Sequence, residues 1–379
     1  MKHGGTKARC MILRRAIQVE LVMLGIMAVI GISINNTRID NIRTEIEKNT
    51  AAETTADTAA ETAEDTQTEE KKDYIKWVEF HVTQAAMERA LRYDLESYQS
   101  ENHIDWIVLL AYAGCRGGGE FGRKSIGYID TAAQALTDGQ SVEKFTQDLQ
   151  YFDYYYEAYS AVLGGFVGEY RIQNENGEEQ TCYGIKVFSP IAAGFDYSDY
   201  DDFGSARSYG YRRPHLGHDM LGLIGTPIVA IESGYVEALG WNQYGGWRIG
   251  IRSFDHKRYY YYAHLRQNYP YAEGLEEGSV VTAGDVIGYM GHTGYSATEN
   301  VNNIEAVHLH WGLELIFDES QKDSNNEIWI DCYELTKFLN SYRSRVEKVG
   351  DTREWARTVQ IVDPAVDAYL EERLTEILH

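Results

Sequence analysis

The chain has 379 residues, enough for two or three domains with a sizeable core. Hydrophobic residues make up 44% and charged residues 25%, so global disorder, a collagen-like chain and a polytopic membrane protein are excluded. The formal net charge of −23 argues against nucleic-acid binding, because Lys and Arg are the main contacts to phosphate backbones. Four cysteines in a chain of this length do not make a disulfide scaffold.

The N-terminus is predicted to tether the protein to a membrane. Residues 1–15 contain five Lys or Arg and no acid, and an apolar run follows within 16–35. We expect residues 16–35 to be a single-pass transmembrane signal anchor, with a cleaved signal peptide or a buried core helix as alternatives. The positive-inside rule then places the basic segment in the cytoplasm and the remainder outside it. The expected localisation is the cell membrane, or secretion if the signal is cleaved.

Residues 36–73 are predicted to form a disordered acidic linker. Between residues 51 and 73 the chain consists almost entirely of Ala, Thr, Glu, Asp, Gln and Lys. Without aromatic or large aliphatic side chains, such a segment cannot offset the entropy lost on ordering.

A helical domain is predicted over residues 74–172. Apolar residues from Trp77 to Leu95 approximate a 3.6-residue period and predict a helix that ends near residue 98. Asp105 can cap a second, buried helix at 106–115, and further helices are predicted at 131–136, 142–149 and 151–163. The glycines at 117–119 lack the Gly-Lys-Ser/Thr of a phosphate-binding loop and indicate a flexible turn. The tyrosines at 154–159 are interpreted as a core or interface helix, with sugar stacking as the alternative, and Glu120 is weak evidence for a lysozyme-type acid.

The sequence of residues 183–318 predicts an antiparallel β domain, because short runs of alternating apolar and polar residues are separated by glycines. Tyr260, Tyr262 and His264 are expected on one strand face. His308 and His310 are expected on the same side of another strand, since strand side chains alternate. Seven of the 11 histidines fall in this unit, and a catalytic zinc site needs three protein ligands and an open position. His215, Asp219 and one of the histidines at 308 and 310 would supply that set.

Several segments of this unit carry a more specific pattern. They are 203–207 (Phe-Gly-Ser-Ala-Arg), 215–219 (His-Leu-Gly-His-Asp), 225–230 (Gly-Thr-Pro-Ile-Val-Ala), 262–265 (Tyr-Ala-His-Leu), 284–288, 291–294 and 308–310 (His-Leu-His). Over residues 203–315 the pattern resembles the M23 metallopeptidases, the LytM or lysostaphin-type peptidoglycan endopeptidases. The resemblance implies a mainly antiparallel β metallopeptidase domain of bacterial origin with one bound Zn²⁺.

The resemblance also implies a role for each matched residue. His215, Asp219 and His310 would be the zinc ligands, and His264 and His308 would be the catalytic histidines beside the zinc-activated water. Such a water is available as hydroxide near neutral pH, and a neighbouring histidine can take its proton or stabilise the oxyanion. Which of the two histidines has which role is left open.

The neighbouring residues have simpler interpretations. His256 is expected in an exposed hairpin turn. His218 fills a variable position of the family motif and His292 matches no required position, so for both a contact with the cleft is the lesser alternative. Tyr260 and Tyr262 are interpreted as packing or cleft-wall residues. The segment 297–307 is longer than is common in the family and is expected to border the cleft. A further hypothesis has basic residues facing the cleft: Arg207, Arg212, Arg213, Arg248 and Arg252.

Residues 319–379 are predicted to be a helical extension, with helices at 328–346 and 363–378. Cys10 is expected in the cytoplasm. Cys182 and Cys332 flank the β domain and a disulfide between them is one alternative, which leaves Cys115 unpaired.

The prediction is thus a multidomain α+β protein that combines a signal anchor, a helical middle domain, a LytM-type metallopeptidase domain and C-terminal helices. Its expected function is a membrane-tethered, extracytoplasmic zinc endopeptidase that hydrolyses peptide bonds in bacterial peptidoglycan. The alternatives are a non-catalytic LytM-like scaffold or regulator of cell-wall hydrolases and a zinc-stabilised wall-binding module. Expected partners are peptidoglycan peptides and the membrane, with cell-envelope proteins at the helical domain as a further option, and no nucleic acid. The cleaved bond is left open.

Overall fold

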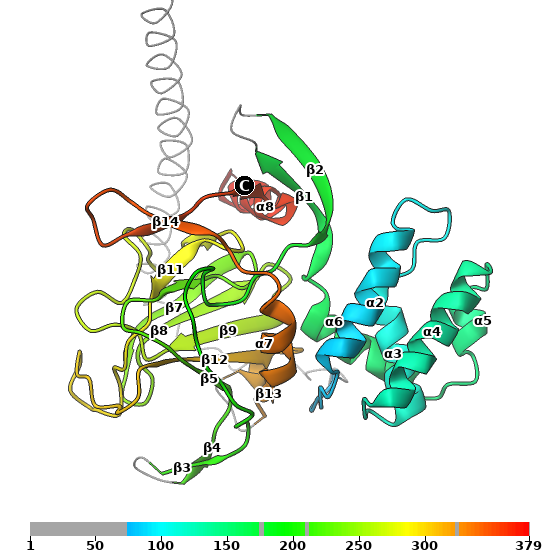
Figure 1. The fold of residues 1–379 in the computed structure, drawn as a ribbon, viewed down its shortest axis with the longest axis horizontal. Helices are drawn as coiled ribbons and strands as arrows, with labels where there is room; N and C mark the ends of the chain where they lie inside the picture. Colours follow the sequence, from blue (N-terminus) through cyan, green and yellow to red (C-terminus); the bar gives the residue numbers. More distant parts are fainter. Residues whose placement is uncertain (1–73, 174–177, 209–211, 323–325, 379) are drawn as a thin grey trace, which may run out of the picture. The chain divides into compact units, whose positions relative to one another are not determined.

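The described chain begins with a run of helices and continues with strands, among which only short helical segments occur before the last helix (Figure 1). The computed structural model describes residues 74–173, 178–208, 212–322 and 326–378. The predicted basic segment 1–15, signal anchor 16–35 and linker 36–73 lie outside the described residues. Within the described ranges, no helix is both long and apolar enough to cross a membrane.

The first part of the described chain is helical. Its helices are α2 (Gln84–Ser97), α3 (Trp106–Gly117), α4 (Arg123–Thr137), α5 (Val142–Thr146) and α6 (Phe152–Leu163). The prediction of a buried helix from residue 106 is confirmed: α3 is buried from Trp106 to Gly114, and α2, α4 and α6 pack against it. The Asp105 side chain caps α3 by accepting a hydrogen bond from the Ile107 backbone N–H at 2.8 Å.

The helix predicted from Trp77 onward begins only at Gln84, and residues 74–83 are not helical. Val78, Phe80 and Val82 are buried, whereas the Trp77 side chain is 60% exposed. This two-residue alternation is typical of an extended chain. The predicted start of the helix was wrong because the alternating run 77–82 leads directly into helix α2. The apolar residues of the two segments together approximate a single helical period.

The β part is built on a seven-stranded antiparallel sheet, which confirms the predicted mainly antiparallel β domain. Its hydrogen-bonded order is β10 (Val280–Val281), β7 (Gly234–Asn242), β8 (Gly246–Ser253), β9 (Arg258–Ala263), β12 (His308–Leu315) and β13 (Ile328–Ile330), and β5 (His218–Leu221) also pairs with β12. Figure 1 shows β7, β8, β9 and β12 side by side.

Short strands complete the β part. The two-stranded sheets are β3 (Ala206–Arg207) with β4 (Arg213–Pro214), β6 (Pro227–Val229) with β11 (Val286–Tyr289), and β14 (Val346–Lys348) with β15 (Trp355–Arg357). A three-stranded sheet contains β1 (Val167–Gln173), β2 (Glu179–Ile185) and β16 (Gln360–Val362). The β1–β2 hairpin therefore spans the boundary predicted between residues 172 and 183.

The two faces of the main sheet differ in chemistry. Ile249, Ile251, Tyr260, Tyr262 and Trp311 alternate on one face and are all buried in the core. The alternate residues of the same strands, which include Arg248, Tyr261 and His310, line a groove on the opposite face. The sheet thus separates an apolar core from a polar surface.

The C-terminal segment is only in part the helical extension that was predicted: the helix expected at 363–378 is confirmed, and the one expected at 328–346 is wrong. Residues 328–346 contain strand β13 and the short helix α7 (Tyr333–Leu339) instead of one helix, and β14, β15 and β16 follow before helix α8 (Pro364–Leu378). Ile328 and Ile330 are buried on β13 with Trp329 between them, a two-residue pattern that pairs with β12. The run was too short for its period to be distinguished from that of a helix.

Candidate functional site

The five predicted site residues lie together at one end of strand β12. His308 and His310 are in β12, and Asp219 is in β5 directly opposite His310. Ala263, the last residue of β9, pairs with His310 from the other side, and His264 follows it. His215 comes directly after the short strand β4. Antiparallel pairing on both sides of β12 therefore brings together residues up to 95 positions apart in the sequence.

Three of these residues converge with their ligand-type atoms. His215 Nε2 lies 3.0 Å from Asp219 Oδ1 and 2.8 Å from His310 Nδ1, and His310 Nδ1 lies 3.0 Å from the same Asp219 oxygen. The ligands of a four-coordinate ion with bonds of 2.0–2.1 Å are separated by about 3.3 Å. The two imidazole nitrogens and the carboxylate oxygen thus fit a small divalent metal ion, and they form the metal-compatible cluster found among the described residues.

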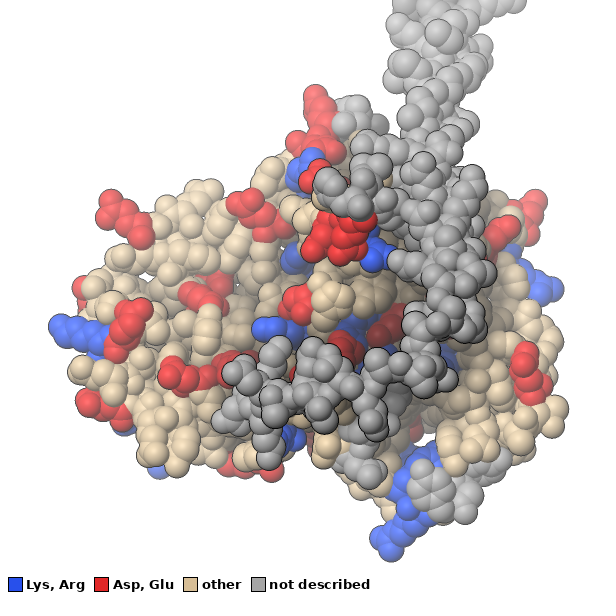
Figure 2. Space-filling model, turned by 180° about the vertical axis from the view of Figure 1, so that it is seen from behind, with Lys and Arg blue, Asp and Glu red and all other residues tan. Residues whose placement is uncertain are grey.

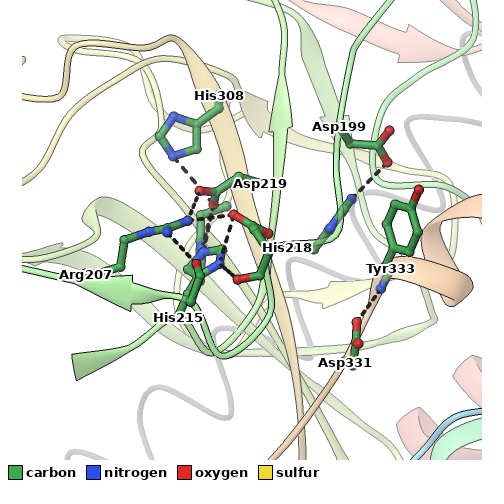
Figure 3. Close-up of polar contacts among 11 residues, drawn as sticks. Asp199, Arg207, His215, His218, Asp219, His308, Asp331 and Tyr333 are labelled. Atoms are coloured by element: carbon green, nitrogen blue, oxygen red, sulfur yellow. Dashed lines mark hydrogen bonds and ion pairs between the residues drawn. The ribbon is translucent and has the colours of Figure 1, made fainter.

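Asp202 and Arg207 contact the ligand residues His215 and Asp219 and orient their side chains. His215 Nδ1 lies 3.1 Å from Asp202 Oδ2, and Arg207 contacts Asp202 at 2.6 Å and Asp219 Oδ2 at 3.0 Å (Figure 3). The His215 Nδ1–H can therefore donate to Asp202, which leaves Nε2 as the lone pair that a metal needs. Arg207 occupies one oxygen of Asp219 and leaves the other for the ion. Asp202 was not among the predicted site residues, although it directly precedes the segment 203–207 of the family pattern.

His308 and His264 lie beside the cluster, and a backbone carbonyl oxygen orients each ring through its Nδ1 atom. The Nδ1 atom of His308 lies 2.9 Å from the Ala306 carbonyl oxygen, and that of His264 lies 2.9 Å from the Thr293 carbonyl oxygen. Each Nδ1–H donates to its carbonyl, so each Nε2 remains a proton acceptor. The two rings are 4.7 Å apart, and His308 Nε2 is 3.7 Å from Asp219 Oδ1. His264 has a positive φ of 62°, and such strained conformations cluster at functional sites.

Burial and hydrogen bonds shift the pKa values of three residues of this site, His264, His310 and Asp219. Burial lowers the pKa of His264 well below 6.5, and the neighbouring His308 and His310 lower it further. Burial likewise lowers the pKa of His310. It would raise the pKa of Asp219, but hydrogen bonds from His215 and His310 overcome this effect and bring that pKa below its ordinary value. Neutral imidazoles and an ionised carboxylate are the forms that bind a metal ion.

The other histidines of the β part lie outside the cluster. His218 is buried and contacts Asp199 at 2.9 Å, and Figure 3 shows it pointing away from its chain neighbour Asp219. His292 Nδ1 lies 2.7 Å from the Ile304 carbonyl oxygen. His256 is in the exposed turn between β8 and β9, as predicted. None of the three lines the groove.

A groove of about 880 Å³ runs over the polar face of the sheet and contains the cluster. Of the four consecutive tyrosines of β9, Tyr259 and Tyr261 line this groove, whereas Tyr260 and Tyr262 are packing residues in the core. The expectation that His264 shares a face with Tyr260 and Tyr262 was wrong, because the chain turns into the left-handed region at His264, past the end of β9.

Three of the five arginines suggested for the cleft line this groove. They are Arg207, Arg213 and Arg248. Arg252 is instead buried away from the groove and forms ion pairs with Glu237 and Glu319. Arg212 is not part of the lining either.

The loop 297–307 does not line the groove, contrary to expectation. Trp247 Nε1 donates to Asn300 Oδ1 at 2.9 Å, and the backbone oxygen of Asn300 accepts from Gln267 Nε2 at 2.6 Å. These contacts hold the loop against Trp247 and Gln267. Cys115, Cys182 and Cys332 are free thiols, so the alternative of a Cys182–Cys332 disulfide was also wrong.

Comparison with known proteins assigns this region to a family. Residues 213–324 match the model of peptidase family M23. The L-Ala–D-Glu endopeptidase of Bacillus subtilis (strain 168) is 40% identical over 160 residues, which are 42% of this chain and 45% of that protein. Lysostaphin of Staphylococcus staphylolyticus is 38% identical over 98 residues, which are 26% of this chain and 18% of that protein. The chain thus spans less than half the length of either relative.

Among solved structures, the lytM protein of Ruminococcus gnavus ATCC 29149 matches with a TM-score of 0.44 and 23% identity. That match covers 72% of this chain and 92% of the other. The match to the family model confirms the family predicted from the motifs. The matched residues include Asp219, His308 and His310 on their strands and His264 directly after β9. Residues 213–324 therefore form a domain of peptidase family M23.

Proposed function

We propose that this protein is a zinc-dependent endopeptidase that cuts peptide bonds in bacterial peptidoglycan. The observation that carries the proposal is the convergence of His215, Asp219 and His310 beside the paired rings of His264 and His308. The names of the relatives, an L-Ala–D-Glu endopeptidase and lysostaphin, support a peptide substrate from the cell wall.

The mechanism assigns each side chain a task. A zinc ion held by His215, Asp219 and His310 would supply a Lewis acid for the scissile carbonyl and would lower the pKa of a water molecule. Of the two paired rings, one accepts the proton of the attacking water through its Nε2 lone pair and the other faces the developing oxyanion. The carbonyl oxygens of Ala306 and Thr293 keep both rings in the required tautomer.

The proposed location is outside the cytoplasm. Residues 16–35 would anchor the protein in the membrane, and residues 36–73 would let the peptidase domain reach the wall. The support is the charge and composition of these segments. Secretion after signal cleavage is the alternative, and the molecular mass of the protein recovered from cells distinguishes the two.

The test is peptide release from purified peptidoglycan of several cross-link types by the full zinc-loaded chain, with products identified by mass spectrometry. His310→Ala is the inactive variant. His81→Ala is the matched control, because His81 lies on the helical part with its side chain 44% exposed. Release by the wild type and the control alone supports the proposal and identifies the bond. A zinc-loaded wild type that cleaves no wall type contradicts it and favours a non-catalytic scaffold.

A further inference from the structure

Arg248 lies in the groove at a defined distance from the metal cluster. Ile249 pairs with Tyr262 of β9, so the next positions on the two strands are Arg248 and Ala263, and Ala263 pairs with His310. Two strand spacings, about 10 Å, therefore separate the backbones of Arg248 and His310 on the same sheet face. The small side chain of Ala263 leaves the space between them open.

The Arg248 guanidinium has no acidic partner. Its Nε atom is buried without a hydrogen bond, and no ion pair joins Arg248 to any acid of the described residues. Neighbouring arginines differ in this respect: Arg207 contacts Asp202 and Asp219, and Arg252 contacts Glu237 and Glu319.

This absence is unusual in a chain with 58 acidic and 35 basic residues. Figure 2 shows acidic side chains spread across the face in view. A buried donor left without a partner costs stability, so such a group is retained where a ligand completes it. The aromatic side chains of Tyr259 and Tyr261 line the groove around it and reduce its hydration.

We propose that Arg248 is a specificity-determining residue that binds a carboxylate of the peptide substrate within two residues of the scissile bond. The inference rests on the proposed peptidase function. An extended peptide advances about 3.3–3.6 Å per residue. If the scissile bond lies at His310, the carboxylate of an acidic residue one or two positions away can therefore reach Arg248. The guanidinium offers paired N–H donors that match a carboxylate, and an amide at the same place cannot accept both with the same strength.

The experiment compares two peptides on the full chain: L-Ala–D-Glu–L-Lys–D-Ala, and the same peptide with the free carboxyl of D-Glu replaced by its amide. Binding to the metal-free protein is measured by calorimetry, so that the result does not depend on hydrolysis. We expect the wild type to bind the acid about tenfold to a hundredfold more tightly than the amide. Arg248→Gln should bind both peptides with the affinity that the wild type has for the amide, and Arg248→Lys should recover part of the preference.

Arg92→Gln is the matched control, because Arg92 is a half-exposed arginine on α2, far from the groove. Equal or absent binding of the two peptides by the wild type overturns the inference, as does an acid preference that survives in Arg248→Gln. The comparison within the wild type holds even if a variant fails to fold. Charge-dependent binding without cleavage of any peptide or wall would instead overturn the proposed peptidase and leave the carboxylate site standing.

Discussion

Arg258 and Glu232 form an ion pair in the interior of the protein, with Nε and Oε2 2.8 Å apart and both side chains buried. The same guanidinium donates to the carbonyl oxygen of Ala161 in α6 at 2.9 Å, and the Tyr260 hydroxyl donates to Glu232 at 2.7 Å. One charged group thus connects the helical part to the sheet that carries the site.

Removing one partner of this pair should destabilise the whole unit. Glu232→Leu removes the buried partner of Arg258 and leaves the half-exposed Asp255, 2.8 Å from the guanidinium, as its remaining acidic partner. We therefore expect the free energy of unfolding to fall by about 3 kcal/mol. Chemical denaturation measures the effect. The double variant Glu232→Leu/Arg258→Met should recover much of the loss, since it removes both charges. A single variant as stable as the wild type would show that the pair contributes little.

Arg207 should affect metal binding without being a ligand. Arg207→Ala frees the outer oxygen of Asp219 and removes the contact with Asp202, so we expect zinc affinity to fall about tenfold to a hundredfold. Competition with a zinc chelator measures the affinity. Asp219→Asn should lose the metal outright. An unchanged affinity in Arg207→Ala would mean that the packed strands alone orient the carboxylate.

His308→Ala is expected to keep the metal and lose activity. The His308 Nε2 atom lies 3.7 Å from Asp219 Oδ1, outside the three converging atoms, so the ligand set stays complete. Loss of a general acid–base group lowers the rate by about 10²–10⁴-fold. Zinc content and peptide cleavage are measured on the same sample. Loss of zinc in this variant, with retention in His310→Ala, would show that the two histidines have the opposite roles.

The metal-free protein should become less stable as the pH falls below about 6.5. Burial lowers the pKa of His264 in the folded state, so below the ordinary value of 6.5 the unfolded chain takes up a proton that the folded chain does not. Stability is therefore lost from that pH down to the folded-state pKa. Melting temperatures between pH 8 and pH 5 measure the slope, which should be shallower in His264→Gln. The same slope in His264→Gln and wild type would assign the effect to other groups, and His256→Gln, in an exposed turn, is the control.

The sequence predicts the site best where the side chains alternate regularly between the two faces of a strand. His308 and His310 could be placed on one strand face because period two follows from strand geometry, and the spacing of His215 and Asp219 singled out a ligand set. Asp202 was missed because its role depends on a contact with His215, 13 positions along the chain, that follows from no strand or helix period. His264 was expected on the same face as Tyr260 and Tyr262, and this was wrong because the left-handed conformation of His264 breaks the alternation.

The helix predicted at 328–346 was wrong for a different reason, whereas the one predicted at 363–378 is confirmed by α8. Short apolar runs such as 328–330 suit a strand or a helix equally well, and the choice depends on a partner strand that lies elsewhere. That partner strand is β12, and its pairing with β13 affects which fragment of the chain can be isolated.

Strand β12 is hydrogen-bonded to β9 on one side and to β5 and then β13 on the other. The family match ends at residue 324, ahead of β13. A fragment cut at that boundary would leave the backbone of Leu313–Leu315 as an unprotected edge on an apolar strand, open to pairing with another copy. We therefore expect the smallest fragment of the M23 domain that stays monomeric to extend past residue 324, because β13 covers the edge of the strand that carries His308 and His310.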